Sequence, residues 1–349
     1  MTKQADFKRR VRARAAKTGE SYTAARAHLA ADPTPHANLH VTNGDSTVPG
    51  LRGTGITGPI LVWRDVLHEG PVPNLPDAEL RQLRASFLDT PVASFIERDT
   101  TLAAHRDGNY VLWFEADLYD QLQLIQILAR LRELAVAPRQ ITLICVGEYP
   151  GIAHFGGLGE LRADQLGRLP ELAMTMLTGD ALDYAATAWS ALRAPDPTGL
   201  REIAARPNPV LRFVSEAFDR LGREYPARRD GLALTERRIL AAVAEGASTA
   251  GAAFTASWRR EARPFLGDTW CLDRIARLTN APHPLLEAES EVIDQHTGLA
   301  LTDTGRRVLD GKDDHVTLNG VDRWIGGVHL TGRDVAWRWD DGPETIVAG

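Results

Sequence analysis

The sequence predicts a mixed α/β fold: a mainly parallel sheet with flanking helices, then a helical segment and a winged-helix-like α+β region. Four short apolar runs, at 39–42, 59–63, 110–114 and 141–146, lack polar alternation, as is typical of strands buried on both faces. Helical patterns separate these runs, and the strongest, at 117–134, repeats leucine and isoleucine along one face. Strands separated by helices indicate parallel pairing.

The composition is that of an ordinary globular protein of several domains. The chain has 349 residues, of which 44% are hydrophobic and 25% are charged. Its two cysteines, Cys145 and Cys271, lie far apart, which excludes a disulfide framework and the usual structural zinc sites. No run approaches the roughly 18 apolar residues of a membrane span. We therefore expect no membrane insertion and a cytoplasmic location.

Four segments follow from changes in pattern along the chain. They are a basic two-helix arm at 1–31, an α/β domain at 38–175, a helical connector at 176–230 and a winged-helix-like domain at 231–349. Proline pairs interrupt the helices of the connector, and a hairpin is expected within 321–341, with its turn near Gly332 and Arg333.

The first segment is strongly basic although the chain as a whole carries a net charge of -6. Residues 1–31 hold eight Lys or Arg against two acids, so the remainder carries -12. An arm at residues 3–26 can bind nucleic-acid phosphates, or it can be solvated or dock on the acidic body. The candidate nucleic-acid contacts are Lys8, Arg9, Arg10, Arg12, Arg14 and Lys17.

An acid follows each of the four predicted strands. These acids are Asp45, Asp65, Glu115 and Glu148. Because ligands bind beyond the carboxyl ends of parallel strands, we expect the acids to converge there as ligands of Mg²⁺ or Mn²⁺. Asp and Ser after a strand are also preferred helix N-caps, and Asp117 fits a cap better than a ligand.

Two nearby loops carry further candidates. His68 lies in the polar loop after the second strand, where it can act as an acid or base beside Asp45, unless it is simply exposed. The run CVGEYPGIAHFGGLGEL contains five glycines, which can let a ligand approach the backbone or can form an irregular turn.

Parts of the sequence resemble two known families. VTNGDS resembles the opening block of the GDS-type esterases and lipases, which would make Ser46 a nucleophile, but their Gly-x-Asn-Asp block and C-terminal Asp-x-x-His pair are missing. HVTNGDS, VWRDVLHEGPVP, LWFEADLYDQLQLIQIL and GLGEL together resemble the bacterial domain-of-unknown-function 1835 family over about residues 38–175. That family implies one domain and no chemistry.

Three functions of different classes remain. The preferred hypothesis is a divalent-metal-assisted enzyme acting on a phosphate ester, nucleotide or nucleic acid. The second is a non-enzymatic regulator that binds nucleic acid through the arm and the winged helix. Residues 231–349 hold 13 basic and 18 acidic residues, which argues against DNA binding by that region and favours a scaffold or protein contact. The third is a GDS-type serine hydrolase.

Overall fold

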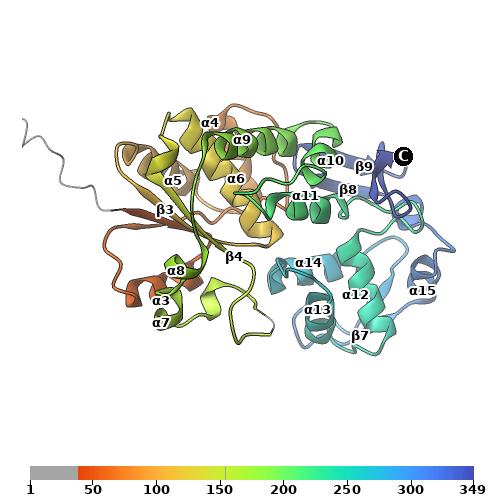
Figure 1. Cartoon of the computed structure of the whole chain (residues 1–349). Coiled ribbons are helices and arrows are strands. Elements are labelled where there is room, and N and C mark those ends of the chain that lie inside the picture. Colours follow the sequence, from red (N-terminus) through yellow and green to blue (C-terminus); the bar gives the residue numbers. More distant parts are fainter. Residues whose placement is uncertain (1–37, 154) are drawn as a thin grey trace, which may run out of the picture.

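A five-stranded sheet forms the centre of the computed structural model, which describes residues 38–349 apart from residue 154 (Figure 1). The strand order is β2-β1-β3-β4-β5. The strands are β1 (Leu39–Thr42), β2 (Ile60–Val62), β3 (Tyr110–Glu115), β4 (Ile141–Val146) and β5 (Met174–Met176). The first four pair in parallel and β5 is antiparallel to β4. The predicted mainly parallel sheet is confirmed, whereas the short antiparallel edge strand was not expected.

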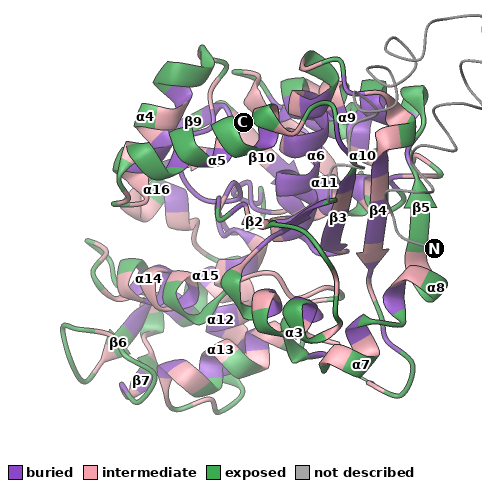
Figure 2. Ribbon diagram, turned by 90° about the vertical axis from the view of Figure 1, so that its left-hand side faces the viewer, coloured by how far each residue is buried: buried purple, intermediate pink, exposed green. Residues whose placement is uncertain are grey.

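Helices cover both faces of the sheet, so its strands alternate between two cores. Leu112 and Phe114 of β3 enter one core, and Trp113, between them, enters the other. Figure 2 shows β3 and β4 largely buried between helices whose outer surfaces are exposed. This double burial explains the continuous apolar strands of the sequence.

The two helical layers differ in size. The larger layer holds α4 (Asp77–Phe87), α5 (Val92–Ala104), α6 (Leu118–Glu133) and α9 (Gly179–Arg193). The opposite face carries the shorter helices η1 (Asp45–Thr47), α3 (Val48–Gly53), η3 (Leu158–Glu160), α7 (Ala163–Leu166) and α8 (Leu169–Ala173), and η2 (Pro138–Gln140) precedes β4. The central helix α6 lies where the leucine pattern predicts a helix.

The C-terminal strands complete the core of the α/β part. The helices α10 (Thr198–Ala204) and α11 (Val214–Gly222) pack beside α9 and α6. Two antiparallel pairs follow at the end of the chain: β8 (Val321–Ile325) with β9 (Val328–Gly332), and β10 (Trp337–Asp340) with β11 (Thr345–Ala348). Ile325, Val328 and Trp339 belong to the same core as the sheet.

The predicted hairpin is present, but the predicted position of its turn is wrong. Gly326 and Gly327 form the two-residue turn of β8 and β9, because Ile325 pairs with Val328. Gly326 has a φ of 59°, which suits the tight turn of a two-residue hairpin. The expected turn residue Gly332 instead ends β9.

A separate core holds the winged-helix-like unit. Its helices are α12 (Leu234–Ala244), α13 (Ala250–Trp258) and α14 (Asp268–Thr279), followed by the antiparallel strands β6 (Leu286–Ala288) and β7 (Leu299–Leu301) and by α15 (Asp303–Leu309). Ile239, Ile275 and Leu286 lie in this core. The short helix α16 (His315–Asn319) leads back to the larger core through Val316.

Across the described residues, no helix combines the length and the apolar character that crossing a membrane demands.

Candidate metal centre

The carboxyl ends of β1 and β3 form the switch point of the sheet, where the direction of the chain across the sheet reverses. The chain runs from β1 to β2 on one side and returns to β3 on the other side of β1. In open α/β sheets, ligands bind at such a reversal, beyond the carboxyl ends of the strands. Asn43 directly follows β1 there, and Glu115 is the last residue of β3.

Three carboxylates meet at this switch point. We call Glu115, Asp117 and Asp120 the acid cluster, since one oxygen of each lies within 4.8 Å of the others. Asp117 and Asp120 are buried, whereas Glu115 is partly exposed. No Lys or Arg in the described part of the chain forms an ion pair with any of the three. The acid cluster could therefore hold a metal ion.

Local folding fixes the geometry of the acid cluster. Asp117 is the N-cap of α6, and its Oδ1 accepts a hydrogen bond from the Asp120 backbone N–H at 3.0 Å. The Nδ2 of Asn43 donates to Asp120 Oδ1 at 2.7 Å, and the Leu158 backbone N–H donates to Glu115 Oε1 at 2.6 Å. The cap predicted for Asp117 is confirmed, and the same side chain belongs to the acid cluster.

Burial and mutual repulsion make these carboxyls hold protons. Burial, followed by the charge of Asp117, raises the pKa of Glu115 to about 8. Burial also raises the pKa of Asp117 to about 6, and burial together with the charge of Glu115 raises that of Asp120 well above its ordinary value. Near neutral pH the acid cluster shares protons, which a divalent cation can replace.

A small cavity beside the acid cluster opens toward the C-terminal region. It has a volume of about 30 Å³ and is lined by Glu115, Asp117, Gly147, Gly157, Arg263 and Pro264, among others. A space of this size holds one or two waters or a bare ion.

Gly157 belongs to the glycine-rich loop and covers Glu115. Its φ is 139°, and a Cβ there would lie 2.4 Å from Glu115 Oε2. Glycine is therefore needed twice, for the backbone conformation and for the close approach to the carboxylate. At Gly157 the close approach is to a carboxylate of the chain itself, and approach of a ligand to this loop stays a prediction.

The predicted cluster of four acids does not form, because only Glu115 reaches the acid cluster. Asp45 lies in η1 with its side chain 67% exposed, and it forms an ion pair with Arg64. The hydrogen bonds from Arg64 lower the pKa of Asp45. A paired surface carboxylate of this kind is poorly placed as a buried ligand or a catalytic group.

Asp65 is buried but already has cationic partners. Arg84 donates to its Oδ1 from Nε at 3.1 Å and from Nη2 at 2.9 Å, and Arg98 lies 3.6 Å from its Oδ2. The loop after β2 turns Asp65 toward α4 and α5 instead of toward the acid cluster. Asp65 therefore serves as the ion-pair partner of two buried arginines, one of which, Arg98, also pairs with Asp99.

Glu148 and His68 also lie apart from the acid cluster. Glu148 is exposed in the loop after β4. His68 is buried between Tyr119 and Phe265, with ring centroids 5.8 and 5.1 Å away, and neither ring nitrogen has a hydrogen-bond partner among the described residues. Burial lowers the pKa of His68 to about 4, so it is uncharged at neutral pH. This placement argues against acid–base catalysis by His68.

The remaining sequence candidates can be placed only in part. Ser46 is exposed on η1 close to Gly159, and in the described chain it makes no hydrogen bond with a histidine. Lys8, Arg9, Arg10, Arg12, Arg14 and Lys17 fall outside the described residues. Nucleic-acid binding by the arm and nucleophilic Ser46 both stay predictions.

The sequence analysis did not identify Asp120 as a candidate, although a local signal exists. Glu115, Asp117 and Asp120 occupy the last position of a strand, the N-cap and the first turn of the next helix. A strand end and a helix start joined by two residues hold these side chains on one edge. Three acids at that spacing are the pattern that could have revealed the site.

Comparisons with known protein families and curated proteins found no match, so the interpretation of the site rests on its geometry. No protein-family model matches the chain, and the search of curated proteins found no match. The resemblance to the domain-of-unknown-function 1835 family accordingly stays a prediction.

Proposed function

We propose that the acid cluster binds one divalent cation, Mg²⁺ or Mn²⁺, and that the protein uses this ion in a reaction at a phosphate ester. The observation that carries the proposal is the set of three carboxylates within 4.8 Å that lacks an ion-paired arginine or lysine among the described residues. Carboxylate oxygens are the preferred ligands of both ions, at about 2.0–2.6 Å, so oxygens on opposite sides of one ion lie about 4–5 Å apart.

The position of the acid cluster supports a reactive site over a purely structural one. It lies at the switch point between the ends of β1 and β3, and Glu115 reaches a cavity instead of being sealed in the core. A divalent ion there would polarise a phosphoryl oxygen and lower the pKa of a bound water. The cation would also satisfy the negative charge that the buried carboxylates otherwise relieve by keeping protons.

Calorimetric titration of chelator-treated protein with MnCl₂ and MgCl₂ tests the proposal. We expect one saturable site, proton release on binding, and an affinity that rises between about pH 6 and pH 8, because the pKa of Asp117 is about 6 and that of Glu115 is about 8. Repeating the titration in buffers of different ionisation enthalpy measures the released protons.

A matched pair of variants locates the ion. Glu115→Gln should weaken Mn²⁺ binding at least tenfold, whereas Asp45→Asn, which alters an exposed acid at the same sheet edge, should leave it unchanged. No saturable binding by the wild type, or equal binding by Glu115→Gln, would refute the proposal. Phosphate release from a panel of nucleotides and phosphomonoesters with Mn²⁺ then tests the reaction class.

A further inference from the structure

The loop at residues 259–267 brings the winged-helix-like unit to the acid cluster. It joins α13 to α14, and its residues Ala262, Arg263 and Pro264 line the cavity shared with Glu115 and Asp117. We propose that this loop completes the site and that Arg263 binds the phosphoryl oxygens of the substrate. The inference rests on the proposed function and adds to it the residue that recognises the anion.

Arg263 is held at the end of β4 by contacts that leave one nitrogen available. Its Nη1 donates to the Gly147 backbone carbonyl at 3.2 Å, and its Nε donates to Glu216 Oε1 at 2.9 Å. Its Nη2 has no hydrogen-bond partner among the described residues, and the side chain is 29% exposed. A guanidinium fixed through two of its nitrogens can present the third to an oxyanion with little loss of entropy.

The backbone of β4 accommodates this arginine closely. A Cβ at Gly147 would lie 2.3 Å from Arg263 Nη1, so any larger residue would displace the guanidinium. Phe213 supports the group from another side, with the Arg263 Cζ 4.7 Å from its ring centroid. Both contacts involve residues of the α/β part, so they hold the loop against that part.

Two residues anchor the loop, one on either side of Arg263, and the first of them is the buried Glu261. Arg220 of α11 donates to Glu261 from Nε and Nη2, with the shortest contact at 2.7 Å, and Arg238 of α12 also forms an ion pair with Glu261. The Glu261 side chain is only 9% exposed. Paired buried charges with good geometry fix the position of a segment.

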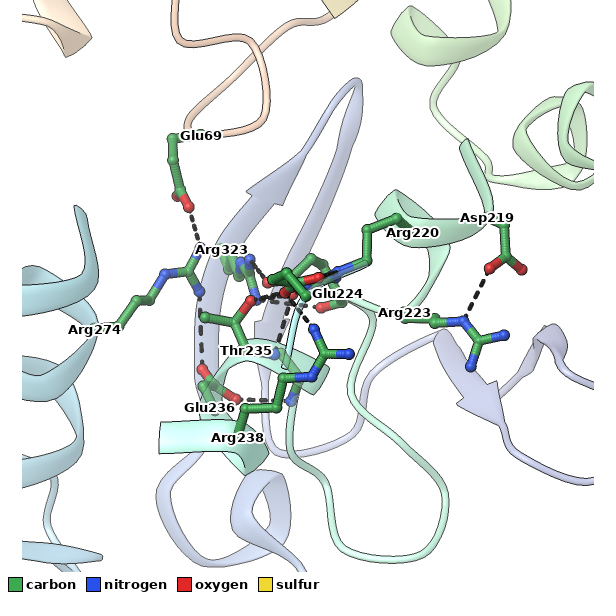
Figure 3. A network of polar contacts seen from close by, with 12 residues as sticks. Glu69, Asp219, Arg220, Arg223, Glu224, Thr235, Glu236, Arg238, Arg274 and Arg323 are labelled. Atoms are coloured by element: carbon green, nitrogen blue, oxygen red, sulfur yellow. Dashed lines mark hydrogen bonds and ion pairs between the residues drawn. The ribbon is translucent and has the colours of Figure 1, made fainter. Parts of the chain in front are cut away.

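Phe265 supplies the second anchor. His68 contacts its ring edge-on, and Arg220 lies over it at 4.9 Å from the centroid. Near this point the Arg274 guanidinium of α14 bonds Glu69, the neighbour of His68, as Figure 3 shows. The winged-helix-like unit thus holds Arg263 over the cavity from two fixed points.

The winged-helix-like unit would then contribute a residue to the site, a role that does not require a basic surface. Over α12 to α15, residues 234–309, nine Arg stand against ten Asp or Glu, so the unit lacks the net positive charge of a DNA reader. One well-placed arginine suffices for a phosphoryl group that a cation in the acid cluster binds from the other side. Because the cavity has a volume of only about 30 Å³, the substrate would insert a phosphoryl oxygen between the ion and Arg263, and the rest of the phosphate would lie at the open side of the cavity.

Binding of inorganic phosphate to the full-length protein in the presence of saturating Mn²⁺ tests the inference. Arg263→Met should leave Mn²⁺ affinity within about twofold of wild type and weaken phosphate binding at least tenfold, a loss expected for one charge-assisted contact. Arg263→Lys, which keeps the charge, should recover part of the affinity. The matched control is Arg212→Met, because Arg212 stacks on the same Phe213 ring without lining the cavity.

Each outcome decides between the two proposals. Unchanged phosphate binding by Arg263→Met, or no phosphate binding by a wild type that binds Mn²⁺, overturns the role of Arg263 and leaves the cation site standing. Equal losses in Arg263→Met and Arg212→Met also overturn it, because they indicate a general charge effect. A wild type that binds no cation overturns both proposals.

Discussion

Two of the buried charge clusters in the described residues accommodate their negative charge in opposite ways. The Glu/Arg network joins four glutamates to four arginines (Figure 3). Its members are Glu69, Glu224, Glu236, Glu261, Arg220, Arg238, Arg274 and Arg323. The acid cluster gathers three carboxylates with no ion-paired arginine or lysine among the described residues.

The proton affinities of the two clusters show the consequence. Burial alone would raise the pKa of Glu224, but the charges of Arg323 and Arg220 hold it well below its ordinary value. At Glu115, where no cation offsets burial and Asp117 adds repulsion, the pKa rises to about 8. A buried acid with an arginine serves the fold, and one without an arginine is free to bind a ligand.

The largest expected effect comes from breaking the Glu/Arg network. Glu224→Gln leaves Arg220 and Arg323 buried without their main partner, so the free energy of unfolding should fall by about 3–5 kcal/mol. Urea denaturation at pH 7 measures this loss. Glu344→Gln, which alters an exposed partner of Arg223, should stay within about 0.5 kcal/mol and serves as control. Equal effects of the two variants would remove the distinction between buried and exposed pairs.

Replacing an acid of the acid cluster should stabilise the protein at high pH, whereas replacing Glu224 should destabilise it. Between about pH 4.5 and pH 8 the folded chain keeps a proton on Glu115 that the unfolded chain releases, so wild-type stability falls as pH rises through this window. The variant Glu115→Gln has no ionisable carboxyl at this position, so this loss of stability with rising pH should be absent. Relative to wild type, the variant should gain about 4 kcal/mol between pH 5 and pH 9, measured by urea denaturation with a chelator present. A variant destabilised equally at both pH values would contradict the proton-sharing cluster.

His68 gives a smaller effect in a lower pH window. Its pKa is about 4 in the folded chain and 6.5 ordinarily, so the unfolded chain binds more protons between these values. Wild-type stability is therefore lost as pH falls from 6.5 toward 4. His68→Phe keeps a ring against Tyr119 and Phe265, and relative to wild type it should gain about 1–2 kcal/mol between pH 7 and pH 4.5. Thermal unfolding across this range checks the gain, and a pH-independent difference would refute it.

The smallest effect belongs to the surface pair. Asp45→Asn should change the free energy of unfolding by no more than about 0.5 kcal/mol, because both Asp45 and Arg64 are largely exposed and solvent screens their attraction. Urea denaturation at low and high salt measures this change. A loss of several kcal/mol would mean that Asp45 has a role beyond this ion pair.

Local sequence patterns were sufficient to predict the sheet and its main helix. The runs at 39–42, 110–114 and 141–146 and the amphipathic pattern at 117–134 became β1, β3, β4 and α6, because burial on two faces or on one leaves a local signature. Asp117 was recognised as a cap for the same reason, since N-capping depends on neighbouring residues alone.

Which acids are paired depends on contacts between distant parts of the chain. Asp65 and Glu115 both follow strands, yet Asp65 meets Arg84, nineteen positions on, and Glu115 meets Asn43, seventy-two positions back. The placement of Arg263 over the cavity likewise depends on how the winged-helix-like unit packs against α11 and the loop after β2. Pairing of charges is set by through-space distance, which local sequence patterns do not encode, and it separates the structural acids from the candidate site.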